Sequence, residues 1–202
     1  MGDVGERRKA VVIGDGACGK TCLLHVFREG RFPEDMRYIP TIFDTWVADM
    51  EVDGRAIELA LWDTAGQEEF ERLRLMCYKD VDVIIMCFSV DQPDSLVNIS
   101  EKWHPEAKAH AAHAPIILAA LKRDLRYDQQ TVAELAEYGQ TTVTEDEGKA
   151  MGKLIGAVTY IECSSIAQEN VREVFEIAAW RALHRRDPVL AGSPRPRCCL
   201  IL

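Results

Sequence analysis

Long hydrophobic runs are missing from this chain of 202 residues. The longest apolar stretch, Val81–Val90, is interrupted by Asp82 and Ser89, and it is too short to cross a bilayer. It predicts a buried strand instead. A secretory signal pattern is missing as well, because charged residues at positions 3 and 6–9 lead directly into the first apolar run. We therefore expect neither a membrane-spanning nor a secreted protein.

A surplus of positive charge is also missing. The chain has 24 Lys and Arg against 33 Asp and Glu, a formal net charge of −9, which argues against a general nucleic-acid binder. Its seven cysteines are odd in number and lack the spacing of a zinc site. Five of them fall in predicted core segments or in a glycine-rich loop, so we expect a reducing, cytosolic environment.

What the sequence has is a regular alternation of strand and helix patterns. Strands are expected at 9–13, 45–52, 56–62, 81–90, 115–121 and 158–161, and helices at 20–29, 95–111, 129–138, 144–154 and 171–183. The alternation predicts an α/β fold, a mostly parallel six-stranded sheet with helices on both faces and ligands at the carboxyl ends of the strands. Asp53-Gly54 predicts a hairpin turn. We expect one domain, 1–187, and a flexible tail rich in Pro, Gly, Ser and Arg, 188–202.

Residues 14–21, Gly-Asp-Gly-Ala-Cys-Gly-Lys-Thr, match the pattern G-x-x-x-x-G-K-[ST] between a strand and a helix pattern. Such loops bind nucleoside triphosphates, because glycines let several backbone N–H groups point at the phosphates and the helix start adds partial positive charge. Lys20 would contact the β/γ oxygens and the Thr21 hydroxyl would bind Mg²⁺. A chance match is expected in about 1% of chains this long. The predicted nucleotide contacts are Gly14, Asp15, Gly16, Ala17, Cys18, Gly19, Lys20, Thr21 and Cys22.

A second motif, Asp-Thr-Ala-Gly-Gln-Glu, follows the strand at 56–62. Asp63 at the strand end could hold Mg²⁺ through water, the Gly66 N–H could reach the γ-phosphate, and Gln67 could orient an attacking water. A single aspartate at such a place is ordinarily a turn or cap residue. Its combination with the loop at 14–21 favours nucleotide hydrolysis.

These motifs, together with four others, resemble the small GTPases of the Ras superfamily and, within it, the Rho family. The other four are Tyr38–Phe43, Lys122–Arg126, Glu162–Ser164 and Cys199–Leu202. The resemblance covers essentially the whole chain and is strongest to the Rho subgroup. It implies a three-layer Ras-like P-loop NTPase fold, with the polar helix at about 127–140 as the insert helix of Rho proteins.

The resemblance also implies roles for individual residues. Thr41 would close over Mg²⁺ and the γ-phosphate, Phe32 would stack on the guanine edge, and Tyr38 would cover the phosphates. Asp124 would accept two hydrogen bonds from guanine, and Lys122 would lay its stem along the nucleotide. Segments around 34–43 and 66–78 would be the switches that γ-phosphate contacts order.

The resemblance further implies two serines near the base, a set of catalytic residues and a set of metal ligands. Ser164 would belong to the last base-contacting motif, where the Ser165 backbone N–H would reach the guanine oxygen. The catalytic residues would be Gln67, Lys20 and Thr41, and the metal ligands Thr21, Thr41 and, through water, Asp63.

Four positions depart from the family pattern. Two loops are concerned: the phosphate loop at 14–21 and the base-reading loop at 122–126. Leu121 stands where an Asn or Thr normally ties one to the other, and Ile166 replaces a lysine near the base. The first switch is two residues longer, through Asp35–Arg37, and Leu75 replaces a proline in the second. An unpaired buried group costs about 1–3 kcal/mol, so these changes bring nucleotide affinity and hydrolysis rate into question.

The chain ends Cys-Leu-Ile-Leu, a Cys-a-a-X pattern that predicts a geranylgeranyl group on Cys199. One lipid binds membranes only marginally, and Cys198 could carry a second, palmitoyl group. A sparse basic stretch, formed by arginines at 185, 186, 195 and 197, would add to the membrane binding. We expect the cytoplasmic face of the plasma membrane, with a cytosolic pool.

The expected function is a GTP/GDP switch that hydrolyses GTP and controls the actin cytoskeleton, cell shape and motility. Its partners would be effectors, exchange factors, GTPase-activating proteins and dissociation inhibitors of the Rho type, with no nucleic acid. The alternative is a pseudo-GTPase or fast-exchanging interaction protein, which Leu121 and Ile166 favour. A nucleotide kinase is disfavoured, because the chain lacks the arginine-rich lid of such enzymes.

Overall fold

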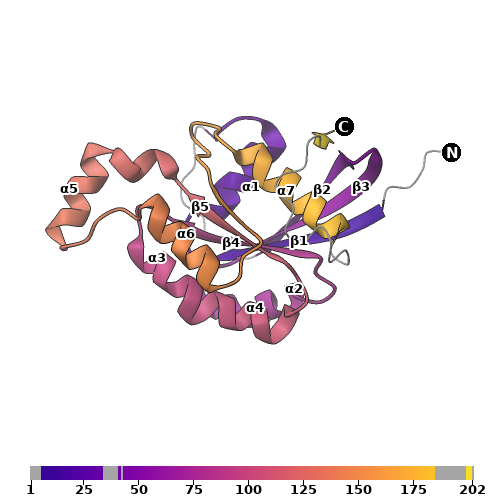
Figure 1. Cartoon of the computed structure of the whole chain (residues 1–202), viewed down its shortest axis with the longest axis horizontal. Helices are drawn as coiled ribbons and strands as arrows, with labels where there is room; N and C mark the ends of the chain where they lie inside the picture. The colour runs from indigo at the N-terminus through magenta and orange to yellow at the C-terminus, as the bar shows by residue number, and fades with distance from the viewer. Residues whose placement is uncertain (1–5, 34–40, 42, 185–198, 202) are drawn as a thin grey trace.

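A computed structural model describes residues 6–33, 41 and 43–184, together with the backbone of 199–201. The described strands form one sheet in the order β6-β5-β4-β1-β3-β2-β7 (Figure 1). Neighbouring strands run parallel except at the β2–β3 and β2–β7 pairs. The strands are β1 Glu6–Gly14, β2 Phe43–Val52, β3 Arg55–Thr64, β4 Val83–Ser89, β5 Ile116–Leu121, β6 Thr159–Glu162 and β7 Cys199–Ile201. The predicted mostly parallel six-stranded sheet is confirmed in β1–β6.

The β2–β3 hairpin turns at the predicted dipeptide. Val52 pairs with Arg55, and the two residues between them, Asp53 and Gly54, have φ angles of 52° and 75°. Two consecutive positive φ values are the mark of a type I′ turn, whose twist matches that of the flanking strands. Strand β3 in turn pairs in parallel with β1, with Asp63 opposite Val12, so Asp63 lies at the same end of the sheet as the loop after β1.

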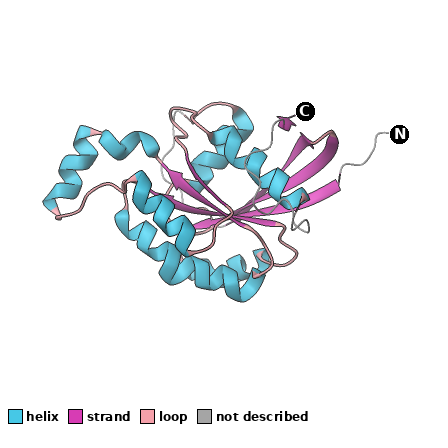
Figure 2. Cartoon of the chain, viewed as in Figure 1, coloured by secondary structure: helices cyan, strands magenta, loops and turns pink. Residues whose placement is uncertain are grey.

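Helices cover both faces of the sheet (Figure 2). Helices α1 (Lys20–Glu29) and α7 (Val171–Leu183) lie on one face. Helices α2 (Glu71–Cys77), α3 (Pro93–Asn98), α4 (His104–Ala111) and α6 (Glu145–Leu154) lie on the other. Strand β1 shows why two cores form: Ala10 and Val12 point into the first and Val11 and Ile13 into the second, as side chains alternate along a strand.

The helix predicted over 95–111 is present but not uniform. Between α3 and α4 lies a π-helical turn, Ile99–Trp103. Pro105, in the first turn of α4, has no backbone N–H to donate to residue 101 and its ring crowds that carbonyl. The wider turn just before it accommodates both effects and buries Trp103 completely.

The helix expected at 129–138 is present as α5, Gln129–Glu137, which projects away from the sheet at the place expected for the insert helix (Figure 1). The Asp128 side chain caps it by accepting a hydrogen bond of 2.9 Å from the Thr131 N–H. A capping box between Thr144 and Glu147 starts α6.

The segment 66–78, expected as a switch, contains a 3₁₀ turn at Glu68–Phe70 followed by α2. A second unpredicted 3₁₀ turn, Arg123–Tyr127, follows β5. Most of the other expected switch, 34–40 and 42, lies outside the described residues, as do 185–187 of the expected domain and 188–198 and 202 of the expected tail. The short strand β7 pairs Ile201 with Met50 and Cys199 with Val52 at the exposed edge of β2, and the sequence analysis does not predict it. Among the described helices, none is both long enough and apolar enough to span a bilayer.

Candidate functional site

The loop between β1 and α1 has the shape that its glycines predict. Gly14 has a φ of 142°, and a Cβ there would lie 2.2 Å from the Cys87 carbonyl oxygen, so only glycine fits. Gly19 caps α1 in a left-handed conformation with a φ of 106°. Within this loop, the Lys20 ammonium donates to the carbonyl oxygens of Gly14 at 2.8 Å and Asp15 at 2.7 Å. The only cation of the loop is thus held inside it, where phosphate oxygens would bind.

Three oxygen-bearing side chains meet beside this loop. The Thr21 hydroxyl donates to Asp63 Oδ2 at 2.6 Å and lies 2.6 Å from the Thr41 hydroxyl. Asp63 is 0% exposed, and its other oxygen, Oδ1, has no hydrogen-bond partner among the described residues. Burial raises the pKa of Asp63, although the Thr21 hydrogen bond and the Lys20 charge act in the opposite direction.

This corner fits a small, hard cation. A buried carboxylate oxygen without a partner, flanked by two hydroxyls, is the donor set that Mg²⁺ takes in proteins. The three residues come from α1, from the end of β3 and from residue 41 before β2. The structure therefore brings together the three side chains that the sequence analysis assigned to the metal.

The segment after β3 touches the phosphate loop through Gly66. A Cβ on Gly66 would lie 2.2 Å from the Gly16 backbone nitrogen and 2.6 Å from the Gly14 carbonyl oxygen. Only glycine allows this approach, which places the Gly66 backbone against the phosphate loop. Gln67 follows in an extended conformation, with φ −73° and ψ 147°, at the start of the 3₁₀ turn.

Arg74 of α2 forms hydrogen bonds to the backbone of this segment. Its Nη1 donates to the carbonyl oxygens of Ala65 at 3.1 Å and Gln67 at 3.3 Å. Its Nε and Nη2 each donate to the Glu106 carboxylate at 2.8 Å. Burial would raise the pKa of Glu106, but hydrogen bonds from Arg74 and Tyr78 outweigh it and lower that pKa. The sequence analysis did not identify Arg74.

Asp15 is also held by residues that the sequence analysis missed. Asn98 donates to Asp15 Oδ2 and the Trp103 indole N–H donates to Asp15 Oδ1, both at 2.7 Å. The guanidinium of Arg74 lies 4.8 Å from the Trp103 ring centroid, within cation–π range. The π-helical turn therefore links the phosphate loop to the segment that carries Gln67.

The residues expected to read the base lie on the other side of the phosphate loop. Asp124 accepts a short hydrogen bond from the Ser164 hydroxyl, which itself accepts one of 3.0 Å from the Ala167 N–H. Lys122 has a left-handed φ of 55° and its ammonium donates to Asp91 Oδ2 at 3.1 Å. A Cβ on Gly19 would lie 3.8 Å from Lys122 Cε. The base-reading and phosphate loops are thus adjacent.

The two departures at the base site have different surroundings. Leu121 is 2% exposed and belongs to the same apolar cluster as Cys18 and Cys163. Its Cδ1 would lie 3.7 Å from a Cβ on Gly19. Leucine therefore replaces a polar tie by apolar packing against the phosphate loop. Ile166 is 60% exposed, where a lysine would project into solvent beside the base.

The remaining expected site residues are only partly placed. Phe32 is half-buried and packs against the core under α1 and α7. Ser165 and Cys22 are half-buried, and the five cysteines whose side chains are described form no disulfide with one another. Tyr38 and Cys198 lie outside the described residues, and only the backbone of Cys199 is described.

Comparison with known proteins gives results consistent with this geometry. The model of the Ras family matches residues 9–184 of the chain. The Rho-related GTP-binding protein RhoB of Homo sapiens is 55% identical over 196 residues, which cover 97% of this chain and 98% of RhoB. RhoB of Mus musculus and of Rattus norvegicus match to the same extent.

Proposed function

The chain belongs to the Ras family, and we propose that it is a Rho-type molecular switch that binds GTP and GDP and hydrolyses GTP to GDP and phosphate. One observation carries this proposal above the others. The Gly66 backbone lies against the phosphate loop beside the Thr21–Asp63–Thr41 cluster. This contact supports the proposal, because groups that would sense a γ-phosphate have to lie close to groups that would bind the β-phosphate.

The phosphate loop would bind the triphosphate through its backbone N–H groups and the Lys20 ammonium. Lys20 already lies within reach of the loop, and a phosphate oxygen would replace the carbonyl oxygens of Gly14 and Asp15 as its partners. Bound Mg²⁺, held by Thr21, Thr41 and, through water, Asp63, would neutralise charge on the β- and γ-oxygens. A γ-phosphate also gives the Gly66 N–H an acceptor, which would fix the second switch.

Gln67 would orient the water that attacks the γ-phosphate. Among the described residues, Arg74 has its guanidinium bonded to Gln67, but it donates to two backbone carbonyls and to Glu106. It is therefore a support for this segment and is not available to stabilise charge on the phosphate. We infer that a GTPase-activating protein supplies that positive charge, so that hydrolysis without the partner is slow.

Asp124 would select guanine. Its carboxylate can accept hydrogen bonds from the guanine N1–H and exocyclic amine together, and adenine does not offer this pair of donors. A charged acceptor facing the wrong base would be left unpaired, which is why such sites discriminate strongly. The Ser164 hydroxyl bonded to Asp124 supports this role by fixing one carboxylate oxygen.

We further propose the partners and location that go with a Rho-type switch. These are effectors, exchange factors, activating proteins and dissociation inhibitors, acting on the actin cytoskeleton, cell shape and motility. Residues 1–187 would form the GTPase domain and 188–202 the tail. Prenylation of Cys199, with a second lipid on Cys198, would hold the protein at the cytoplasmic face of the plasma membrane, with a cytosolic pool.

A second function, that of a pseudo-GTPase or fast-exchanging interaction protein, is favoured by the two departures at the base site. Leu121 makes an apolar contact where the family has a polar tie, and Ile166 leaves the base edge without a lysine. The two proposals differ in whether nucleotide stays bound long enough to be hydrolysed.

The deciding experiment identifies the nucleotide that copurifies with the full chain. After denaturation, the released nucleotide is separated by chromatography, and GTP turnover by the native protein is measured with and without Mg²⁺. We expect about one guanine nucleotide per chain and Mg²⁺-dependent turnover. The matched control is Lys20→Ala, which removes the loop cation and should lose both. An adenine nucleotide, or guanine nucleotide without turnover, would overturn the switch proposal.

A further inference from the structure

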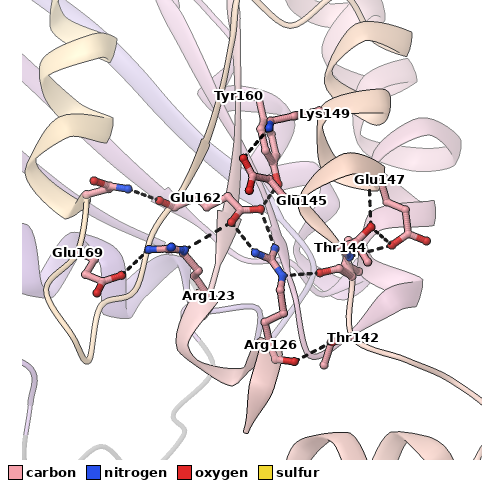
Figure 3. A network of polar contacts seen from close by, with 12 residues as sticks. Arg123, Arg126, Thr142, Thr144, Glu145, Glu147, Lys149, Tyr160, Glu162 and Glu169 are labelled. Atoms are coloured by element: carbon pink, nitrogen blue, oxygen red, sulfur yellow. Dashed lines mark hydrogen bonds and ion pairs between the residues drawn. The ribbon is translucent and has the colours of Figure 1, made fainter.

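Two arginines and one glutamate join the two loops that would contact the base (Figure 3). Arg126, in the 3₁₀ turn after β5, donates from Nη1 and Nη2 to the two oxygens of the Glu162 carboxylate, at 2.6 and 2.7 Å. Glu162 is the last residue of β6, two residues before Ser164. Arg123 lies 3.6 Å from the same carboxylate and donates to Glu169 at 2.7 Å. In the sequence, Asp124 thus lies between two arginines that both contact Glu162, which acts as their common anchor.

The anchor is itself fixed. Tyr160 donates its hydroxyl to Glu162 Oε1 at 2.5 Å, and Asn170 donates to the Glu162 carbonyl oxygen at 2.7 Å. Arg126 and Glu162 are both buried, so their positions are set by neighbours on every side. Burial acts to raise the pKa of Glu162, but the hydrogen bonds from Arg126 and Tyr160 outweigh it and lower that pKa. The carboxylate is therefore charged at neutral pH.

Arg126 also closes the chain on both sides of the insert helix. Its Nε donates to the Val143 carbonyl oxygen at 2.8 Å, and the Thr142 hydroxyl donates to the Arg126 carbonyl oxygen at 3.0 Å. The chain leaves the sheet after Leu121, forms α5 and returns at 142–143, where Thr142 is bonded to the Arg126 backbone and Val143 to its side chain. One guanidinium thus fixes the base-reading turn to β6 and to the end of the insert.

We propose that Arg126 and Glu162 are positioning residues for the guanine-reading Asp124, and that they determine how strongly the site discriminates guanine from hypoxanthine. This rests on the proposed function, in which Asp124 accepts hydrogen bonds from the base. Leu121 and Ile166 remove the polar tie and the lysine that the family uses near the base. The Arg126–Glu162 pair is the buried, bidentate contact that still holds the Asp124 turn against the strand that leads to Ser164.

The physical reason is geometric. A carboxylate accepts two hydrogen bonds from one base edge only when its plane and position match that edge, and a small displacement weakens both bonds. On one side of the turn, Asp124 is bonded to Ser164 and the Arg123 N–H donates to the Cys163 carbonyl oxygen at 3.1 Å. Arg126, two residues further along, fixes the other side of the turn to Glu162, the last residue of β6.

A buried arginine–glutamate pair could instead serve only the stability of the fold. Replacing such a pair by apolar residues of similar size is often neutral or stabilising, whereas removing one partner leaves an uncompensated charge. The double variant Arg126→Met/Glu162→Leu therefore separates the two roles. It removes the ionic anchor without burying an orphan charge, while Glu162→Gln alone is expected to lower both stability and positioning.

The experiment measures the release rates of GDP and IDP, each with a fluorophore on the ribose, from Mg²⁺-loaded protein. IDP lacks the exocyclic amine and so loses one of the two hydrogen bonds to Asp124. For the unaltered chain we expect IDP to leave about 10-fold faster than GDP or more. In Arg126→Met/Glu162→Leu we expect GDP release to rise on the order of 10-fold and the IDP-to-GDP ratio to fall towards one.

The control is Arg55→Met/Glu6→Leu, which removes an arginine–glutamate pair at the amino ends of β1 and β3, whereas the base loops follow the carboxyl ends of β5 and β6. It should leave the IDP-to-GDP ratio unchanged. Thermal unfolding of each variant accompanies the rates. If the Arg126→Met/Glu162→Leu variant keeps both its melting temperature and the ratio of the unaltered chain, the positioning role is refuted. A ratio near one in the unaltered chain itself would instead refute the proposed role of Asp124.

Discussion

Gln67 and its neighbour Gly66 show how much of this site depends on single residues. The Gly66 backbone approaches the phosphate loop so closely that a Cβ would lie 2.2 Å from the Gly16 nitrogen. That contact fixes where the next residue begins, and Gln67 leaves it in an extended conformation. The role proposed for Gln67 comes from its motif. Its position was not, because the contact joins loops about 50 residues apart in the chain.

Replacing Gln67 by Leu tests its role in hydrolysis. Leucine has a similar length but no polar atom to hold a water, so we expect stimulated GTP hydrolysis to fall about 100-fold or more. GTP binding should persist, because Lys20 and the loop backbone remain. The measurement is phosphate release with a Rho-type activating protein present. Hydrolysis at the unaltered rate would show that the water is held by another residue.

The two departures at the base site give a second test at this scale. Leu121→Asn would restore a polar tie from the base loop to the phosphate loop, and Ile166→Lys would return a cation near the base. An unmade bond there costs about 1–3 kcal/mol, which is roughly a 5- to 150-fold change in affinity, mostly seen in the release rate. We therefore expect the double variant to release fluorescent GDP more slowly than the unaltered chain.

The control for this pair of substitutions is Leu154→Asn, which introduces the same polar residue at an exposed position on α6. It should leave the release rate unchanged. If neither Leu121→Asn nor the double variant slows release, the apolar packing of Leu121 against Gly19 compensates for the missing tie. Fast nucleotide exchange would then have to come from the first switch, which is two residues longer than in the family.

At the scale of elements, the alternation of strands and helices was readable because it follows from the period of the hydrophobic pattern. The break between α3 and α4 was not. The spacing of Leu96, Ile99 and Trp103 fits an α-helix and does not predict the π-helical turn that precedes Pro105. That turn directs Trp103 to Asp15, across 88 positions in the sequence. Contacts of this kind depend on tertiary packing, which periodicity does not encode.

Helix α2 provides a prediction that belongs to this scale. Arg74 ties α2 to the carbonyl oxygens of Ala65 and Gln67 and to Glu106. Arg74→Lys keeps the charge but loses the planar fork that makes these bonds together. We expect intrinsic GTP hydrolysis to fall on the order of 10-fold because Gln67 loses its support, while the IDP-to-GDP release ratio stays the same.

Single-turnover hydrolysis of bound GTP measures this effect without interference from nucleotide release. Arg72→Lys is the matched control, since Arg72 lies on the same helix with its side chain exposed. It should hydrolyse GTP like the unaltered chain. Equal rates for Arg74→Lys and Arg72→Lys would mean that α2 does not act on Gln67 through Arg74.

At the scale of the whole molecule, the described domain and the end of the chain differ in what the sequence could establish. The domain follows from many concordant patterns, which is why six strands and five helices could be predicted. The tail has no such patterning. Its last motif predicts chemistry rather than structure, and the β7 pairing with β2 uses backbone groups of an exposed sheet edge, which any short segment can join.

The Cys199 anchor is the prediction on which the location of the whole molecule depends. Burial of a prenyl chain in the bilayer supplies about 0.8 kcal/mol for each CH₂ group, and a second lipid is needed for stable attachment. Cys199→Ser should therefore move the full chain from membranes to the cytosol. Cys198→Ser should weaken or redistribute membrane binding without abolishing prenylation. The measurement is fractionation of cells that express each variant, with mass spectrometry of the C-terminal peptide.

Cys22→Ser controls for the loss of a thiol elsewhere and should still be found at membranes. Membrane-bound Cys199→Ser would show that another part of the protein holds it there.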